Sequence, residues 1–121
     1  MKVLIVDDSK AMRLMIKRAL RQSGFSGLET IEASDGTEGL EKAQSQKPEV
    51  IISDWNMPNM SGMDLLKALR AADHPARFGF ITTETTADAR ERALNEGASF
   101  MLTKPFTVET FREALAPMVR G

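Results

Sequence analysis

Residues 50–60 read Val-Ile-Ile-Ser-Asp-Trp-Asn-Met-Pro-Asn-Met, an apolar run that stops at an acidic residue and continues into a turn. The run 50–53 is short and continuously apolar up to its last residue, which is typical of a strand buried on both faces of a parallel sheet. Asp54 follows it directly, and Pro58 and Gly62 indicate a loop. The stretch predicts a buried strand with a carboxylate at its carboxyl end.

The same arrangement of a short apolar run followed by an amphipathic stretch recurs along the chain. Strands are expected at 3–6, 28–33, 50–53, 78–81 and 99–102. Helices are expected over 87–95 and after the capping residues Ser9, Asp35, Ser61 and Thr107, and Asp35 with Glu38 has the spacing of a capping box. Five strands alternating with five helices predict an α/β fold, with a parallel sheet covered by helices on both faces. No repeat or linker divides the chain, so one domain over 1–121 with no output domain is expected.

Composition excludes several classes of function. The chain has 16 Lys and Arg against 17 Asp and Glu, and this balance argues against a nucleic-acid-binding protein. It has no cysteine, which excludes disulfides, thiolate metal sites and cysteine nucleophiles. No apolar run is long enough to span a membrane, and the amino terminus lacks a signal peptide. We expect a cytoplasmic monomer.

The distinctive polar residues all follow predicted strands. Asp7 and Asp8 come after the first strand, Asp54 after the third, Thr82 after the fourth and Lys104 after the fifth. In an open α/β sheet, ligands bind at the carboxyl edge, so these side chains are expected to form one site.

This set of residue types suits phosphoryl chemistry. Three neighbouring carboxylates repel one another unless a cation neutralises them, and Mg²⁺ takes carboxylate and phosphate oxygens as ligands. An aspartyl-phosphate also needs charge relief on the three equatorial phosphoryl oxygens. Mg²⁺ would contact one of these oxygens, the Lys104 ammonium a second and the Thr82 hydroxyl a third.

Four motifs carry a family resemblance. They are Val-Asp-Asp-Ser at 6–9, Ser-Asp-Trp-Asn-Met-Pro-Asn-Met at 53–60, Thr-Thr-Glu at 82–84 and Lys-Pro-Phe-Thr at 104–107. Over its whole length the chain resembles the response-regulator receiver domain, and within that family the stand-alone chemotaxis regulators. The resemblance implies a flavodoxin-like, doubly wound sheet with strand order 2-1-3-4-5.

The resemblance also implies a role for each residue of the site. Asp54 would accept a phosphoryl group from a phosphohistidine on a histidine kinase or phosphotransfer domain. Lys104 would pair with that group, its peptide bond to Pro105 would be cis, and Thr82 would move towards the phosphoryl group as a switch. The implied ligands of Mg²⁺ are the carboxylates of Asp7, Asp8 and Asp54 and the main-chain carbonyl of Asn56.

The sequence departs from the family pattern at positions that affect switching. Met101 stands where the family usually has Tyr or Phe, and Phe100 cannot replace that aromatic because neighbouring strand residues point to opposite faces. We therefore expect a looser, more continuous switch. Thr83 is larger than the usual residue and is expected to narrow access to Asp54. Glu84 and Asn56 occupy positions that tune the hydrolytic water, although loop polarity explains Glu84 equally well.

Several surface features have two interpretations. The first helix is expected to bury Met12, Met15, Ile16, Ala19 and Leu20 and to expose the basic residues Lys10, Arg13, Lys17 and Arg21. Those basic residues form either a solvated face or a surface that steers an acidic kinase. Phe106 and Phe111 belong either to an output face or to the core, and packing is favoured for Phe111. His74, the single histidine, cannot build a histidine metal site or an autokinase.

The favoured function is a phosphorylation-controlled binding switch, acting on a flagellar motor or relaying phosphate in another pathway. The protein is not expected to be an enzyme with a separate substrate. A Mg²⁺-dependent aspartyl-phosphate phosphatase generally needs a carboxylate two residues beyond the nucleophile, where this chain has Asn56. A flavin or nucleotide binder is disfavoured because the turn 7–9 contains no glycine to cradle phosphate.

Overall fold

A computed structural model describes residues 1–25, 27–84 and 86–119. All ten expected elements are present there, and every strand boundary falls within one residue of its expected position. In chain order the elements are β1 Lys2–Val6, α1 Lys10–Gln22, β2 Glu29–Ala33, α2 Gly36–Gln46, β3 Val50–Ser53, α3 Gly62–Ala71, β4 Arg77–Thr82, α4 Ala87–Asn95, β5 Phe100–Thr103 and α5 Val108–Val119.

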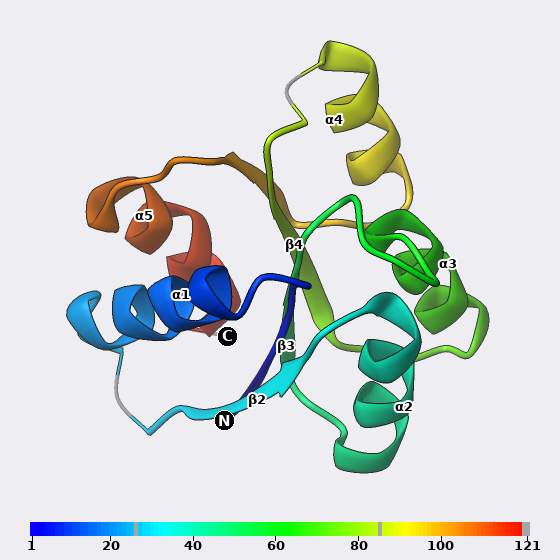
Figure 1. The fold of residues 1–121 in the computed structure, drawn as a ribbon, viewed down its shortest axis with the longest axis horizontal. Coiled ribbons are helices and arrows are strands. Elements are labelled where there is room, and N and C mark those ends of the chain that lie inside the picture. The colour runs from blue at the N-terminus through cyan, green and yellow to red at the C-terminus, as the bar shows by residue number, and fades with distance from the viewer. Residues whose placement is uncertain (26, 85, 120–121) are drawn as a thin grey trace.

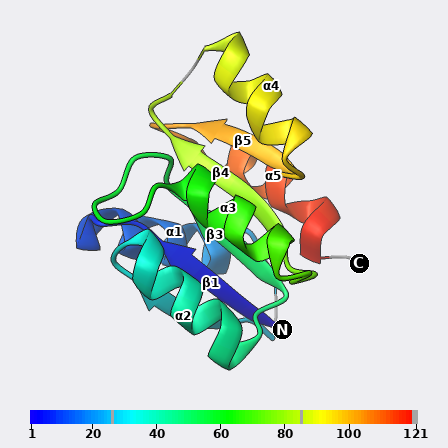
Figure 2. The ribbon, with the colours of Figure 1, turned by 90° about the vertical axis from the view of Figure 1, so that its right-hand side faces the viewer.

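The five strands form one sheet in the order β2-β1-β3-β4-β5, and each neighbouring pair is parallel. This confirms both the α/β class and the strand order. The register pairs Val6 with Ala33 on one side and with Ser53 on the other, so the three strands end together. Figure 2 shows the strand ends meeting the loops before α1 and α3 at one edge.

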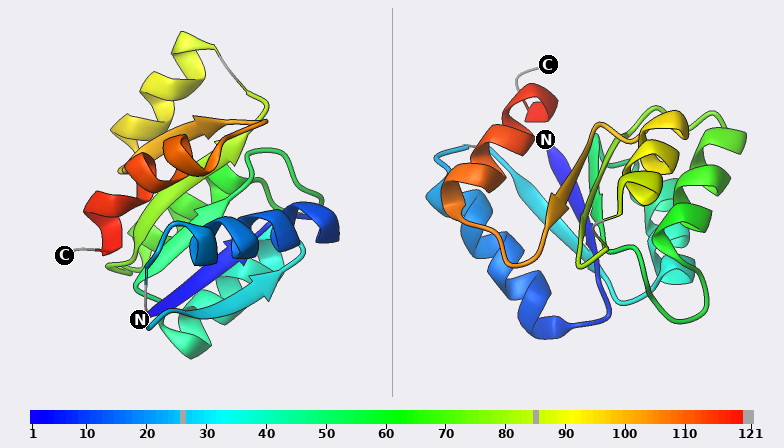
Figure 3. Two further views of the ribbon diagram at one scale, coloured as in Figure 1. Left: turned by 90° about the vertical axis from the view of Figure 1, so that its left-hand side faces the viewer. Right: turned by 90° about the horizontal axis from the view of Figure 1, so that it is seen from above.

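Helices cover both faces of the sheet, with α1 and α5 on one side and α2, α3 and α4 on the other (Figures 1 and 3). Alternate side chains of a strand point to opposite faces, so one strand can contribute to both layers. In β1, Val3 and Ile5 pack on the α1–α5 side, whereas Leu4 and Val6 pack on the α2–α4 side. Burial on both faces explains why the central strands are continuously apolar.

The expected helix caps form, with one difference at α2. Asp35 Oδ1 accepts a hydrogen bond from the Glu38 amide at 2.8 Å, and Ser61 Oγ accepts one from the Asp64 amide at 3.1 Å. A capping box would return the Glu38 carboxylate to the Asp35 amide, but it accepts instead from the amide and hydroxyl of Ser34. The α2 amino terminus is therefore held by two carboxylates.

Helix α1 differs from the expectation on both of its faces. Ile16, Ala19 and Leu20 are buried, but Met15 is 46% exposed, so its expected place on the buried side was wrong. Two of the basic residues are not simply solvated, because Arg13 Nε and Lys17 Nζ pair with the Glu32 carboxylate of β2 at 2.9 and 3.2 Å. Within the described part of the chain, no helix combines the length and apolar character that crossing a membrane requires.

Candidate functional site

The backbone places the candidate residues together at the carboxyl edge of the sheet. Hydrogen bonds continue one residue beyond the strands, from the Asp7 amide to the Ala33 carbonyl at 3.1 Å and from the Asp54 amide to the Val6 carbonyl at 2.9 Å. On the other side the Lys104 amide donates to the Thr82 carbonyl at 2.9 Å. Rigid strand ends therefore fix the main chain of each residue.

Lys104 bridges two of the acidic residues. Its Nζ lies 3.1 Å from Asp7 Oδ2 and 3.1 Å from Asp54 Oδ2. The side chains of Lys104 and Asp54 are 14% and 13% exposed, and that of Asp7 only 1%. A cation held by two carboxylates in so dry a place is a strong electrostatic feature, because little water screens the charges.

Burial and charge act in opposite directions on these groups. Burial raises the pKa of Asp7 despite the hydrogen bonds that it accepts from the Ser9 amide and from Lys104. Burial alone would lower the pKa of Lys104, but the hydrogen bond to Asp7 and the negative charges of Asp54 and Asp7 outweigh it and raise that pKa. Lys104 is therefore firmly protonated, while Asp7 is poorly solvated and gains from any added cation.

The carboxylates suit a hard divalent cation. Asp7, Asp8 and Asp54 each offer an oxygen, and these oxygens lie within 4.8 Å of one another. The backbone orients two of these carboxylates, because Asp7 Oδ1 accepts from the Ser9 amide at 2.9 Å and Asp54 Oδ1 from the Trp55 amide at 2.7 Å. Such an all-oxygen set fits Mg²⁺, with exposed Asp8 on the solvent side where the ion can keep water ligands.

Thr82 ends β4 with no exposed surface. Its Oγ1 accepts a hydrogen bond from the Glu84 amide at 3.1 Å and keeps its own hydrogen to donate. Thr83 is exposed, whereas Glu84 is half-buried and accepts from the Thr86 hydroxyl at 3.3 Å. Asn56 is exposed in the loop that follows Asp54. Thr83 directly follows β4, and its effect on access to Asp54 stays a prediction.

Met101 and Phe100 lie on opposite faces of the sheet, as expected. Met101 is 6% exposed and belongs to the α2–α4 side of the core, whereas Phe100 packs on the α1–α5 side. Met101 pairs in register with Phe80 of β4. The side chain at the switch position is therefore a buried thioether beside an aromatic ring.

The sequence did not predict the row of aromatic rings that lies beside the site. The Trp55 ring lies 5.0 Å from the Phe80 ring, which lies 5.1 Å from the Phe78 ring. The spacing of Phe78 and Phe80 placed them on one face of β4, but the contact with Trp55 depends on the path of the loop. The row links the residue after Asp54 to the core.

The remaining features are structural. The Lys104–Pro105 bond is cis, as the resemblance implies. Phe111 is fully buried, which confirms the packing interpretation, and half-buried Phe106 stacks on it with ring centroids 5.4 Å apart. The His74 ring bridges Ala43 O and the Ala76 amide at 3.0 and 3.2 Å, and so joins the turn before β4 to α2.

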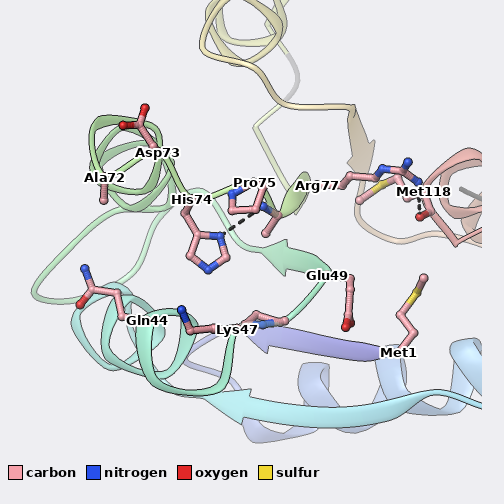
Figure 4. Close-up of a pocket in the computed structure, with 12 residues that line it drawn as sticks. Met1, Gln44, Lys47, Glu49, Ala72, Asp73, His74, Pro75, Arg77 and Met118 are labelled. Carbon is pink, nitrogen blue, oxygen red and sulfur yellow. Dashed lines mark hydrogen bonds between the residues drawn. The ribbon is translucent and has the colours of Figure 1, made fainter.

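A cavity of about 680 Å³ lies at the opposite, amino-terminal edge of the sheet (Figure 4). Met1, Glu49 and Arg77 from the starts of β1, β3 and β4 line it together with His74 and Met118. Two of its polar groups are already engaged, because Arg77 donates to the α5 carbonyls and Glu49 accepts from the Lys2 amide. The cavity contains none of the candidate residues, so size alone does not identify the site.

Comparison with known proteins identifies the family to which the chain is similar. Residues 3–116 match the family model described as the response regulator receiver domain. The chain is 39% identical to the chemotaxis protein CheY of Pseudomonas aeruginosa, over 95% of this chain and 93% of that protein. It is 38% identical to chemotaxis protein CheY-3 of Vibrio cholerae, over 95% and 88%.

Solved structures show the same fold. The chemotaxis response regulator CheY4 of Vibrio cholerae superposes with a TM-score of 0.84 at 39% identity, over 97% of each chain. The signal receiver domain of the putative response regulator NarL of Mycobacterium tuberculosis gives a TM-score of 0.88 at 30% identity, over 99% of this chain and 96% of that one.

Proposed function

Because the chain belongs to the response regulator receiver domain family of two-component systems, we propose that it is a phosphorylation switch in which Asp54 accepts a phosphoryl group with the help of Mg²⁺. The observation that carries this proposal is the Lys104 ammonium between the Asp7 and Asp54 carboxylates, with Asp8 in the same cluster. The donor is a phosphohistidine on a histidine kinase or phosphotransfer domain. The protein modifies itself and is not an enzyme with a separate substrate.

The chemistry divides among the residues by position. An Asp54 oxygen attacks phosphorus, an O–P bond forms, the N–P bond of phosphohistidine breaks and imidazole leaves with its electron pair. Asp7, Asp8, Asp54 and the carbonyl of Asn56 are the residues that hold Mg²⁺, which supplies charge neutralisation on a phosphoryl oxygen when bound. Lys104 keeps its ammonium near Asp54 and neutralises a second oxygen.

Thr82 supplies the third contact and the signal. Its buried hydroxyl keeps a hydrogen to donate, so it gains a strong acceptor when Asp54 carries a phosphoryl group. A shift of Thr82 towards that group loosens the packing of the β4–β5 face around Met101. The phosphorylated conformer then differs in partner affinity, which is how a population shift becomes an output.

The proposed output is control of a flagellar motor by direct binding. Two relatives that match over 95% of the chain are named chemotaxis proteins. Capture of a motor component by the phosphorylated protein, and not by the Asp54→Asn variant, supports this pathway. Transfer of the phosphoryl group to a second phosphotransfer domain would support a relay instead.

Trp55 reports on the chemistry directly, because its amide donates to Asp54 Oδ1 at 2.7 Å and it is the single tryptophan. Its fluorescence is expected to change on adding Mg²⁺ and again on adding a small acyl phosphate. Asp54→Asn should abolish the second change and keep much of the first. Asp73→Asn, the same chemical change in a left-handed residue at the opposite edge, should keep both. A silent Trp55 with no phosphorylated species by intact mass would refute the proposal.

A further inference from the structure

The loop between β3 and α3 is tied to the start of α2 by one side-chain bond. Asn59 Nδ2 donates to Asp35 Oδ2 at 2.7 Å, while Asp35 Oδ1 accepts from the Glu38 amide at 2.8 Å. One carboxylate therefore caps α2 and holds the loop. Asn59 has a φ of 69°, a left-handed conformation that Asn tolerates better than most residues.

A glycine at the start of α2 also lets the backbone of the loop approach the helix closely. A Cβ added to Gly36 would lie 2.7 Å from Met60 Cβ and closer still to the Met60 carbonyl oxygen. The loop thus rests directly on the first turn of α2, where a larger residue would push it away. The Asp35–Asn59 bond and the Gly36–Met60 contact together are called the loop latch below.

The latch lies close in sequence to a proposed metal ligand. Asn56 is exposed and stands three residues before Asn59. The Gly62 amide donates to the Trp55 carbonyl at 2.9 Å, so the two ends of the loop are joined and the residue directly before Asn56 is held. The exposed residues between these ends would still sample many conformations, and binding an ion would then have to order them. A second anchor at Asn59, inside the loop, lowers that cost further.

We propose that the loop latch positions the Asn56 carbonyl for Mg²⁺, and that Asp35 and Asn59 are positioning residues for the phosphoacceptor site. This inference rests on the proposed function and adds residues from a second element, α2, to the machinery. Among the residues that the structure describes, no hydrogen bond or ion pair joins either side chain to the three carboxylates, so the effect acts through the path of the loop. Outer partners of this kind typically change metal affinity about 10-fold or more when they orient a ligand directly, and a smaller factor is expected here.

The test measures Mg²⁺ affinity by Trp55 fluorescence in variants that keep the local backbone. Asn59→Gly removes the amide and retains access to positive φ, and Asp35→Ser keeps a capping oxygen for α2 but loses the second oxygen. Each change should weaken Mg²⁺ binding about 5-fold, and the double variant should bind no more weakly than either single one, because both remove the same bond. Gly36→Ala, which displaces the loop from the other side, should weaken binding similarly.

A second readout separates positioning from simple structural support. Hydrogen exchange of the amides of residues 56, 57, 59 and 60 in EDTA should speed up several-fold in Asn59→Gly, while the urea midpoint in EDTA moves little. A midpoint that falls with unchanged Mg²⁺ affinity, or single effects that add in the double variant, would overturn the latch. Those results would leave the wild-type Mg²⁺ and phosphodonor responses intact, whereas failure of the proposed function removes the wild-type responses themselves.

Discussion

At the scale of single residues, Lys104 decides the electrostatics of the site. Asp7 is 1% exposed, so the protein has to compensate its charge, and Lys104 does so from 3.1 Å. Lys104 also holds Asp54 at the same distance. Removing one charged side chain from such a group leaves the remaining buried charges unpaired. The resulting loss of stability is larger than the net stabilisation that the ion pair provides.

Lys104→Met is expected to lower the free energy of unfolding by about 2 kcal/mol in EDTA, less than for a fully buried pair because water still reaches Lys104 and Asp54. In Mg²⁺ the loss should be smaller, since the ion replaces the missing positive charge. Urea unfolding with and without Mg²⁺ measures both values. Lys47→Met, in an exposed lysine at the opposite edge, serves as the control. An equal loss under both conditions would contradict the argument.

Met101 is the residue at which we expect the conformational switch to be graded. An unbranched thioether fills space in several rotamers, so its movement after phosphorylation should be graded. A labelled Met101 ε-methyl group should give one motionally averaged NMR resonance before phosphorylation and one at saturation with a phosphoryl mimic. Two discrete resonances within either pure state, unphosphorylated or saturated, would show that the side chain switches between two positions instead. Met101→Ala should cost about 2 kcal/mol because the side chain is buried.

At the scale of elements, the Glu38 carboxylate at the start of α2 makes a pH-dependent contribution to the stability of the fold. The pKa of Glu38 lies below its ordinary value of 4.5, mainly because the carboxylate accepts from the Ser34 amide. Its folded pKa is depressed, so the stabilisation is complete above the ordinary pKa and disappears as the pH falls through the folded one. Glu38→Gln should cost about 0.5 kcal/mol at pH 7, because solvent screens the half-exposed group, and the cost should shrink as the pH falls below 4.5 towards pH 3.

Urea unfolding of the wild type and Glu38→Gln across this pH range checks the prediction. Glu41→Gln, in an exposed glutamate of the same helix, provides the comparison. A wild-type advantage that persists unchanged at pH 3 would mean that packing, and not the carboxylate charge, explains the difference.

Local signals predicted the elements well because they act within a few residues. The β-branched runs gave the strands, and the oxygen of Asp35 gave the start of α2. What failed depended on how the backbone runs and on which elements pack against a helix. Glu38 turned to Ser34 because the chain before α2 brings that amide close, and Met15 stayed exposed because α5 and the sheet cover only part of α1. Helical spacing alone does not reveal how wide the covered side is.

At the scale of the whole molecule, the parallel sheet explains both the success and the limit of the site prediction. Parallel strands align their carboxyl ends, so residues from β1, β3, β4 and β5 could be brought together from sequence order alone. The loop latch and the Trp55–Phe80 contact could not, because they depend on how the loop after Asp54 folds back over α2 and α3.

The same topology links the proposed metal site to global stability. The carboxylates of that site follow two central strands of the sheet, which unfold together. Mg²⁺ that binds only the folded state should stabilise the wild type by about 1.4 kcal/mol for each tenfold excess over its dissociation constant. Asp8→Asn should remove most of this gain. In EDTA the variant should be as stable as the wild type or slightly more stable, because exposed Asp8 adds repulsion to Asp7 and Asp54. Urea unfolding measures these values, and an unchanged slope of the unfolding free energy against urea concentration would show that only stability has changed. A Mg²⁺ gain that survives in Asp8→Asn would place the ion outside this carboxylate cluster.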